Sequence, residues 1–141
     1  MRDLEFAKRT LNASGLALVI VKDGVVLFED DSPGILGFLR AVDELKERLV
    51  GCSVGDRVVG RAVAMLCVYV RAKSVYAVTL SEGGRETLKS FGVYFEFERL
   101  VPKILDMAKK DVCPFEKLAE KALSPKEAYE RLRAFLRREA L

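Results

Sequence analysis

The sequence contains no histidine and no tryptophan, and its 141 residues include no glutamine and a single asparagine, Asn12. Because no imidazole is present, the chain cannot form a Ser-His-Asp or Cys-His triad, a histidine-ligated zinc site or a histidine general base. Proton transfer would depend on carboxylates, lysines, tyrosines or thiols whose pKa is moved toward neutrality by burial or by neighbouring charges. The absence of histidine therefore excludes several large classes of enzyme.

Long apolar runs and dense charge of one sign are also missing. No stretch reaches the roughly 18 apolar residues that a membrane-spanning helix needs. The N-terminal "MRDLEFAKRT" lacks the apolar centre of a secretory signal, so we expect a cytoplasmic protein with no membrane partner. The 24 basic and 21 acidic residues are mixed along the chain, for a net charge of +3. Without a concentrated basic tract, binding to nucleic acid is not expected.

Cysteine is scarce, and Cys52, Cys67 and Cys113 lie far apart with no Cys-x-x-Cys pair among them. An odd number of widely spaced cysteines does not indicate a disulfide framework, and a cysteine-only zinc site would have to be assembled by tertiary proximity. The sequence therefore predicts no metal site and no cofactor. The scarcity of amides, together with 32% charged residues, is typical of thermophilic proteins.

The first part of the chain predicts a helix followed by a β-hairpin. Half of the residues are hydrophobic, and the length suits a single domain over residues 1–141. Residues 3–13 have the apolar spacing of an amphipathic helix. Residues 16–21 and 25–29 are expected to be strands, and the Asp-Gly pair between them at residues 23–24 is a strong hairpin signal. The predicted sheet therefore begins with an antiparallel hairpin.

Two helices are expected in the middle of the chain. Ser32 and Pro33 suit the N-cap and the first position of a helix whose apolar residues continue to Leu49. Residues 49–54 fit either a short strand or a connector. The stretch "GDRVVGRAVAML" at residues 55–66 opens with two glycines and an Asp-Arg pair and then becomes apolar on most sides. We interpret it as the start of a buried helix in which Gly60 allows close packing, and the alternative is the mouth of an active site.

The second half of the chain alternates strands and helices. The apolar "SVYAVTL" at residues 74–80 is typical of a central parallel strand, Ser81 is expected to cap the following helix, and "VYFEF" at residues 93–97 is expected to be the next strand. Short helices are expected over residues 100–108 and 114–122. Residues 124–141 are predicted to form a C-terminal amphipathic helix that begins with a capping box.

This order of elements, together with "DRVVGRAVAML", "VYAVTLSEGG", "RLVPKIL" and "VCPFEKL", resembles the uncharacterised family called domain of unknown function 1893, whose fold is cytidine-deaminase-like. The resemblance covers about residues 1–123. It implies an α/β fold of three layers, an αβα sandwich around a mixed sheet. It does not imply deamination, because the family has no settled activity.

The segments that would hold zinc in a deaminase differ here. Zinc deaminases use a His-or-Cys-Ala-Glu segment at the start of one helix and a Pro-Cys-x-x-Cys segment at the start of the next. The corresponding segments are "GRA" at residues 60–62 and "SEGG" at residues 81–84, which carry neither an imidazole nor a thiol. Zinc-dependent deamination is therefore not expected, and whether the chain is an enzyme stays open.

Ligands of open α/β sheets bind beyond the carboxyl ends of the strands, where helix N-termini present backbone N–H groups. Glycines there would let the backbone approach an anion, and arginines would pair with phosphate. The candidate ligand-binding residues are Asp56, Arg57, Ser81, Glu82, Gly83, Gly84, Arg85 and Cys113. The alternative interpretations are that the glycines form only a turn, that Asp56 caps a helix, and that Cys113 is a buried anchor rather than a thiol activated by a helix N-terminus.

Three hypotheses of function follow. The leading one is a non-zinc protein of deaminase-like fold that binds a phosphate-bearing or nucleotide-like small molecule. The second is a metal-free enzyme that uses Asp56, Glu82 or Cys113 as acid, base or nucleophile. The third is a structural module that forms a homodimer, or binds a partner, through a helix face or the "VYFEF" edge.

Overall fold

The computed structural model describes residues 2–32, 34–105 and 111–140, and its strands form one mixed sheet in the order β2-β1-β3-β4-β5. The strands are β1 (Leu18–Lys22), β2 (Val25–Asp30), β3 (Ser53–Val59), β4 (Ser74–Ser81) and β5 (Tyr94–Val101). β1 pairs antiparallel with both β2 and β3, whereas β3, β4 and β5 run parallel. The predicted hairpin between β1 and β2 is confirmed, with Asp23 and Gly24 at positive φ in the turn.

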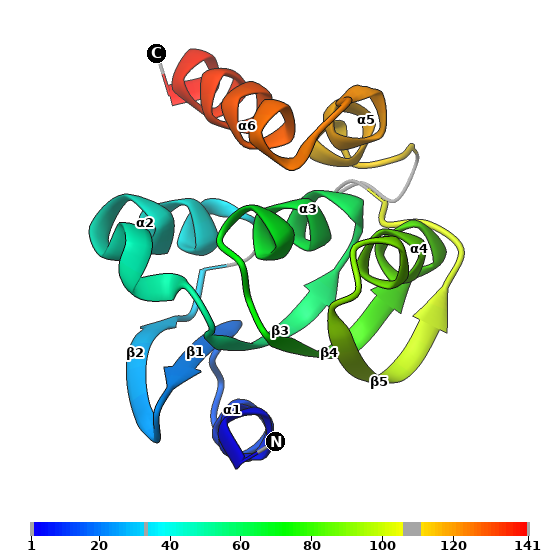
Figure 1. The fold of residues 1–141 in the computed structure, drawn as a ribbon. Coiled ribbons are helices and arrows are strands. Elements are labelled where there is room, and N and C mark those ends of the chain that lie inside the picture. The colour runs from blue at the N-terminus through cyan, green and yellow to red at the C-terminus, as the bar shows by residue number, and fades with distance from the viewer. Residues whose placement is uncertain (1, 33, 106–110, 141) are drawn as a thin grey trace.

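Helices cover both faces of this sheet, which confirms the predicted three-layer αβα arrangement (Figure 1). α1 (Arg2–Ala13) lies on one face, where Leu4, Ala7 and Leu11 are buried as their spacing predicts. α2 (Leu36–Leu45), α3 (Arg61–Tyr69) and α4 (Glu82–Ser90) lie on the other face, and the short helix η1 (Lys46–Leu49) follows α2. The larger core lies between these helices and the sheet.

A further layer lies on the outer side of α3. It consists of α5 (Pro114–Lys121) and α6 (Pro125–Ala140), which both contact α3 (Figure 1). Leu132 of α6 is fully buried, and the ring of Tyr129 stacks on that of Tyr69 with 4.6 Å between centroids. The C-terminal helix therefore packs on its own chain. Within the described part of the chain, no helix has the length and apolar character needed to cross a bilayer.

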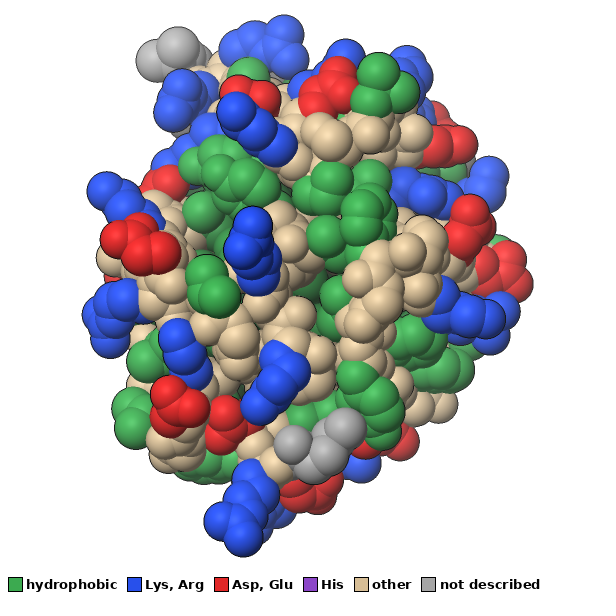
Figure 2. Space-filling model, viewed as in Figure 1, with side chains coloured by type: hydrophobic (Ala, Val, Ile, Leu, Met, Phe, Trp, Pro, Cys, Tyr) green, Lys and Arg blue, Asp and Glu red, His purple; other side chains and the backbone are tan. Residues whose placement is uncertain are grey.

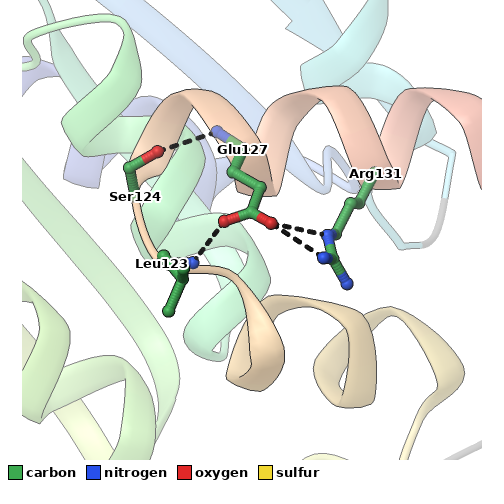
Figure 3. Close-up of polar contacts among 4 residues, drawn as sticks. All are labelled: Leu123, Ser124, Glu127 and Arg131. Atoms are coloured by element: carbon green, nitrogen blue, oxygen red, sulfur yellow. Dashed lines mark hydrogen bonds and ion pairs between the residues drawn. The ribbon is translucent and has the colours of Figure 1, made fainter.

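Acidic and basic side chains are interspersed over the face that carries α6, with hydrophobic side chains open between them (Figure 2). The start of α6 is fixed by the predicted capping box (Figure 3). Ser124 Oγ accepts the N–H of Glu127 at 3.1 Å, and the Glu127 carboxylate accepts the N–H of Leu123 at 2.6 Å. The other carboxylate oxygen of Glu127 accepts from the guanidinium of Arg131 at 2.8 Å. The carboxylate is therefore bonded both to Leu123, before the helix, and to Arg131, one turn further along it.

Several predicted boundaries are wrong. Asp56 and Arg57 do not open a helix, because they lie within β3, which is paired with β1 on one side and β4 on the other. Ser32 is not the cap of α2, which begins after Ile35, and Pro33 lies outside the described residues. The expected helix over residues 100–108 is also wrong at its start, because β5 stays paired with β4 as far as Val101; residues 106–110 lie outside the described residues. In the first and last of these cases strand pairing overrides the local pattern.

Candidate functional site

Two helix N-termini meet at the carboxyl edge of the sheet. β3 and β4 are parallel and paired as far as Val59 and Leu80, so the residues that follow them, Gly60 and Ser81, reach the same edge. α3 starts after Gly60 and α4 after Ser81. A Cβ added to Gly84 would lie 2.9 Å from the carbonyl oxygen of Val59 and 3.1 Å from that of Gly60. Only glycine permits this approach, so the two helix starts are packed backbone to backbone.

The N-terminus of α3 is capped by a carboxylate from another helix. Glu116, in the first turn of α5, accepts the N–H of Arg61 through Oε1 and the N–H of Ala62 through Oε2, both at 2.7 Å. Gly60 has no side chain to cap α3, and a Cβ there would collide with the Glu116 carboxylate and with Ile104. The expectation of close packing at Gly60 is therefore confirmed. The space that a side chain at this position would need is occupied by the Glu116 carboxylate.

Opposing effects act on the charge of Glu116. Burial raises its pKa, whereas the N–H bonds from Ala62 and Arg61 and the positive charge of Arg61 lower it, and burial prevails. Bonding of a carboxylate to a helix N-terminus is favourable because the helix dipole and the N–H groups both stabilise negative charge. Glu116 therefore places a carboxyl group where a bound anion would sit on α3.

The start of α4 keeps several of the predicted site residues together. Ser81 is the N-cap, and its Oγ accepts the N–H of Gly84 at 2.9 Å, as predicted. The guanidinium of Arg61 lies across Gly83, with Nη2 3.0 Å from where an alanine Cβ would be. Glu82 and Arg85 are exposed in the first turns of the helix. Neither Arg61 nor Arg85 forms an ion pair with a described residue.

Arg57, by contrast, does not reach this edge. Its guanidinium donates to three backbone carbonyls, those of Leu16 at 2.7 Å, Ser14 at 2.7 Å and Leu11 at 2.9 Å. These carbonyls lie at and just beyond the end of α1, where helical carbonyls lack partners within the helix. Arg57 therefore ties β3 to the end of α1, and its donors are not directed toward a phosphate.

Asp56 is buried, with 7% of its surface exposed, on the same face of β3 as the core residue Val54. Its carboxylate accepts the N–H of Val58 at 3.2 Å. Burial raises the pKa of Asp56 to about 8, although bonds from Val58 and Arg57 N–H groups act in the opposite direction. Asp56 is thus neither an N-cap nor a crevice residue, and its carboxyl group titrates inside the core.

Cys113 lies at the start of α5, close to Glu116. It is the N-cap of α5, its carbonyl accepts the N–H of Glu116 at 2.9 Å, and its own N–H donates to Ile104 at 3.0 Å. This turn brings the side chain of Glu116, in α5, to the N-terminus of α3. The other two cysteines, Cys52 and Cys67, are fully buried, and burial raises the pKa of the Cys52 thiol to about 12.

The residues at this edge do not fit a zinc ion. The deaminase-type segments hold Gly60, Arg61 and Ala62 on one side and Ser81 to Gly84 on the other, and the nearby carboxylate of Glu116 is bonded to α3. Among the described residues, no three Cys, Asp or Glu side chains come close enough together to hold a metal ion. A zinc site would require thiol, imidazole or carboxylate ligands in these positions.

A family model described as domain of unknown function (DUF1893), TM1506, matches residues 6–136. This chain belongs to that family. A DUF1893 family protein from Thermotoga maritima, TM1506, is 22% identical to it in a crystal structure, over 94% of this chain and 89% of that one, with a TM-score of 0.85. No curated protein is significantly similar to this DUF1893 chain.

More distant likenesses lie among deaminase-like proteins. RibD of Acinetobacter baumannii is 20% identical over 69% of this chain, which spans only 33% of the RibD chain, with a TM-score of 0.50. A dCMP deaminase from the cyanophage S-TIM5 is 14% identical over 71% of this chain and 94% of that one, with a TM-score of 0.48. The fold of this DUF1893 protein is cytidine-deaminase-like, as the resemblance implied.

Glu116 is the site residue that the sequence did not indicate. It lies 55 residues from Arg61 along the chain. An acidic residue soon after a helix-starting proline is common, because it favours the dipole of its own helix. Nothing in that local pattern distinguishes Glu116 from an ordinary first-turn acid.

Proposed function

We propose that this DUF1893 protein binds a small phosphate-bearing molecule, nucleotide-like in size, where α3 and α4 begin. The observation that carries the proposal is the position of Arg61 and Arg85 at two adjoining helix N-termini without an ion-pair partner among the described residues. Positive side chains are disfavoured at helix N-termini by about 0.3–1 kcal/mol each. A bound anion would reverse that cost, because the two guanidinium groups and the start of α4 would attract it, while the start of α3 is already capped by Glu116.

The chemistry of the site suits phosphate in particular. Guanidinium groups pair with phosphate through two parallel N–H bonds, and the main chain of Gly83 permits close approach. Ser81 adds a hydroxyl group at the same helix start. The nucleotide-like part of the proposal is supported by the deaminase-like fold, and the phosphate part by the arginines.

The proposal assigns binding and no reaction. The carboxylate of Glu116 is engaged by two backbone N–H groups, and Asp56 lies in the core, so neither of these two groups is placed to exchange a proton with a molecule at the start of α4. Glu82 is the acidic residue at the site itself, exposed in the first turn of α4.

Thermal-shift and calorimetric titrations with pyrophosphate, CMP and AMP test the proposal. Binding should raise the stability by about 2.7 kcal/mol when the ligand is at a hundred times its Kd. Arg61→Ala and Arg85→Ala should each weaken binding at least tenfold. Arg9→Ala is the matched control, because Arg9 is exposed on α1 at the opposite face of the sheet and should leave the affinity unchanged. Absence of saturable binding by all three ligands would overturn the proposal.

A further inference from the structure

A hollow lies at the opposite edge of the sheet from this site, where β3 and β4 begin. It is an open hollow lined by the end of α2 with η1, by the last turn of α3 and by Tyr129 of α6, and its volume is about 620 Å³. Val50 and Arg71 line it, and they precede β3 and β4 respectively. We call it the Tyr129 groove. Its size lies within the usual range of small-molecule pockets.

The groove has an aromatic wall. The rings of Tyr69 and Tyr129 are nearly parallel, with an angle of 9° between their planes and 4.6 Å between their centroids. Both are partly buried where α6 packs on α3, so the stack is held in place before any ligand arrives. Val50, 44% exposed, adds apolar surface beside it. A rigid aromatic and apolar lining favours a planar ligand.

Two positively charged residues that line the groove have an unusual backbone conformation. Lys46 has φ 48° and Arg71 has φ 61°, at the ends of α2 and α3. Helices usually end in this way on glycine, because a side chain at positive φ costs conformational energy. The third non-glycine residue at positive φ among the described residues is Asp23, in the β1–β2 turn, where an Asp-Gly pair is ordinary. Both long cations are therefore kept at positions where glycine would be less strained.

A cation near a helix C-terminus is favoured by the helix dipole, and this accounts for part of the preference. It does not account for both side chains lining one groove. Neither Lys46 nor Arg71 forms an ion pair with a described residue. The acidic Asp43 in the lining is paired with Arg133 of α6. The remaining charged residues of the lining are one acid, Glu47, and two cations, Lys46 and Arg71.

From the aromatic wall and the surplus of positive charge, we propose that the Tyr129 groove binds a planar aromatic molecule that carries one anionic group, a carboxylate or a phosphate. The ring would pack against the Tyr69–Tyr129 wall, and the anion would lie between Lys46 and Arg71. This site is separate from the one at the start of α3 and α4, and it does not depend on it.

Indole-3-acetate is a suitable probe, because the protein contains no tryptophan and indole fluorescence reports only on the ligand. We expect saturable binding of indole-3-acetate and at least tenfold weaker binding of the neutral indole-3-acetamide. Arg71→Gly and Lys46→Gly should each weaken binding of indole-3-acetate at least fivefold. Both variants should unfold at the same temperature as the wild type or higher, because glycine accepts positive φ.

Asp23→Gly is the matched control, since it relieves positive φ remote from the groove and should leave the affinity unchanged. Arg61→Ala should also leave it unchanged, which separates this groove from the phosphate site. The proposal is overturned if the probe does not saturate, if the amide binds as well as the acid, or if the folded Arg71→Gly and Lys46→Gly variants bind like the wild type. Loss of binding in Arg61→Ala would overturn it too, by placing the probe at the other edge.

Discussion

The carboxylate of Glu116 occupies the space that a side chain at position 60 would need, so Gly60 and Glu116 together form the cap of α3. These two residues belong to two of the sequence stretches that resemble the DUF1893 family, "DRVVGRAVAML" and "VCPFEKL". A third stretch, "VYAVTLSEGG", adds Gly84, whose backbone lies against Gly60. Stretches far apart in sequence therefore meet in one junction.

Gly60→Ala should lower the free energy of unfolding by about 1–3 kcal/mol, because the added methyl group displaces the carboxylate cap. The backbone of Gly60 has φ −103°, which alanine adopts without strain, so the loss would come from the collision. Urea unfolding measures it. Gly15→Ala is the control, because nothing lies within 4 Å of a Cβ there. In a Glu116→Ala background the same change at position 60 should cost much less, and full additivity of the two would argue against a shared space.

Arg57→Ala should lower the free energy of unfolding by about 2–4 kcal/mol, because three carbonyls at the end of α1 lose a charged donor. Phosphate affinity should not change in the folded variant. Chemical denaturation and calorimetry measure the two effects, with Arg9→Ala as the control for removal of an arginine. An unaltered stability combined with lost phosphate binding would contradict this role of Arg57.

Asp56 should make the protein less stable as pH rises. Its pKa is about 8 in the folded chain against 3.8 in a model compound. The folded state therefore holds a proton that the unfolded state releases between these values, and stability falls as pH rises through that window. The total effect is on the order of 6 kcal/mol for a shift of this size.

Asp56→Asn should flatten this pH dependence and stabilise the protein at pH 8–9, because the amide oxygen still accepts the N–H of Val58. Urea unfolding of both proteins from pH 5 to pH 9 provides the measurement. Asp31→Asn, at an exposed position, should run parallel to the wild type. If the curves of Asp56→Asn and the wild type have the same slope, the proton is held elsewhere.

Ser124→Ala should destabilise the protein by about 1 kcal/mol, since Ser124 Oγ is the acceptor for the N–H of Glu127. The melting temperature should fall by about 3 °C, and amide exchange should accelerate in the first turn of α6. Ser90→Ala, at the exposed end of α4, should change the stability by less than about 0.5 kcal/mol. If Ser124→Ala and Ser90→Ala change the stability equally, the hydrogen bond from Glu127 N–H to Ser124 does not stabilise the protein.

The features that the sequence predicted correctly depend on residues close together in the chain. The Asp23-Gly24 turn, the Ser81 cap and the Ser124–Glu127 capping box are each formed within a few residues. Their chemistry is local, so a short stretch of sequence carries the whole signal.

The wrong predictions concern segments whose structure is determined by residues distant in the sequence. The "GDR" at residues 55–57 has the composition of a turn or a helix start, yet Asp56 pairs with Leu18 of β1 and Ala77 of β4. The cap of α3 needs a carboxylate 55 residues away. The first-turn glycines of α4 were predicted to lie at a site, but the arginine that lies across Gly83, Arg61, comes from another helix. Such pairings depend on the completed sheet and cannot be read from spacing.

Helix α3 runs from the carboxyl edge of the sheet to the edge where β3 and β4 begin. Its nine residues form a rod about 13 Å long, with the Glu116 junction at one end and Tyr69 at the other. A displacement of this rod along its axis would disturb both contacts together. The two C-terminal helices therefore set the position of α3 at both of its ends, α5 through Glu116 and α6 through Tyr129.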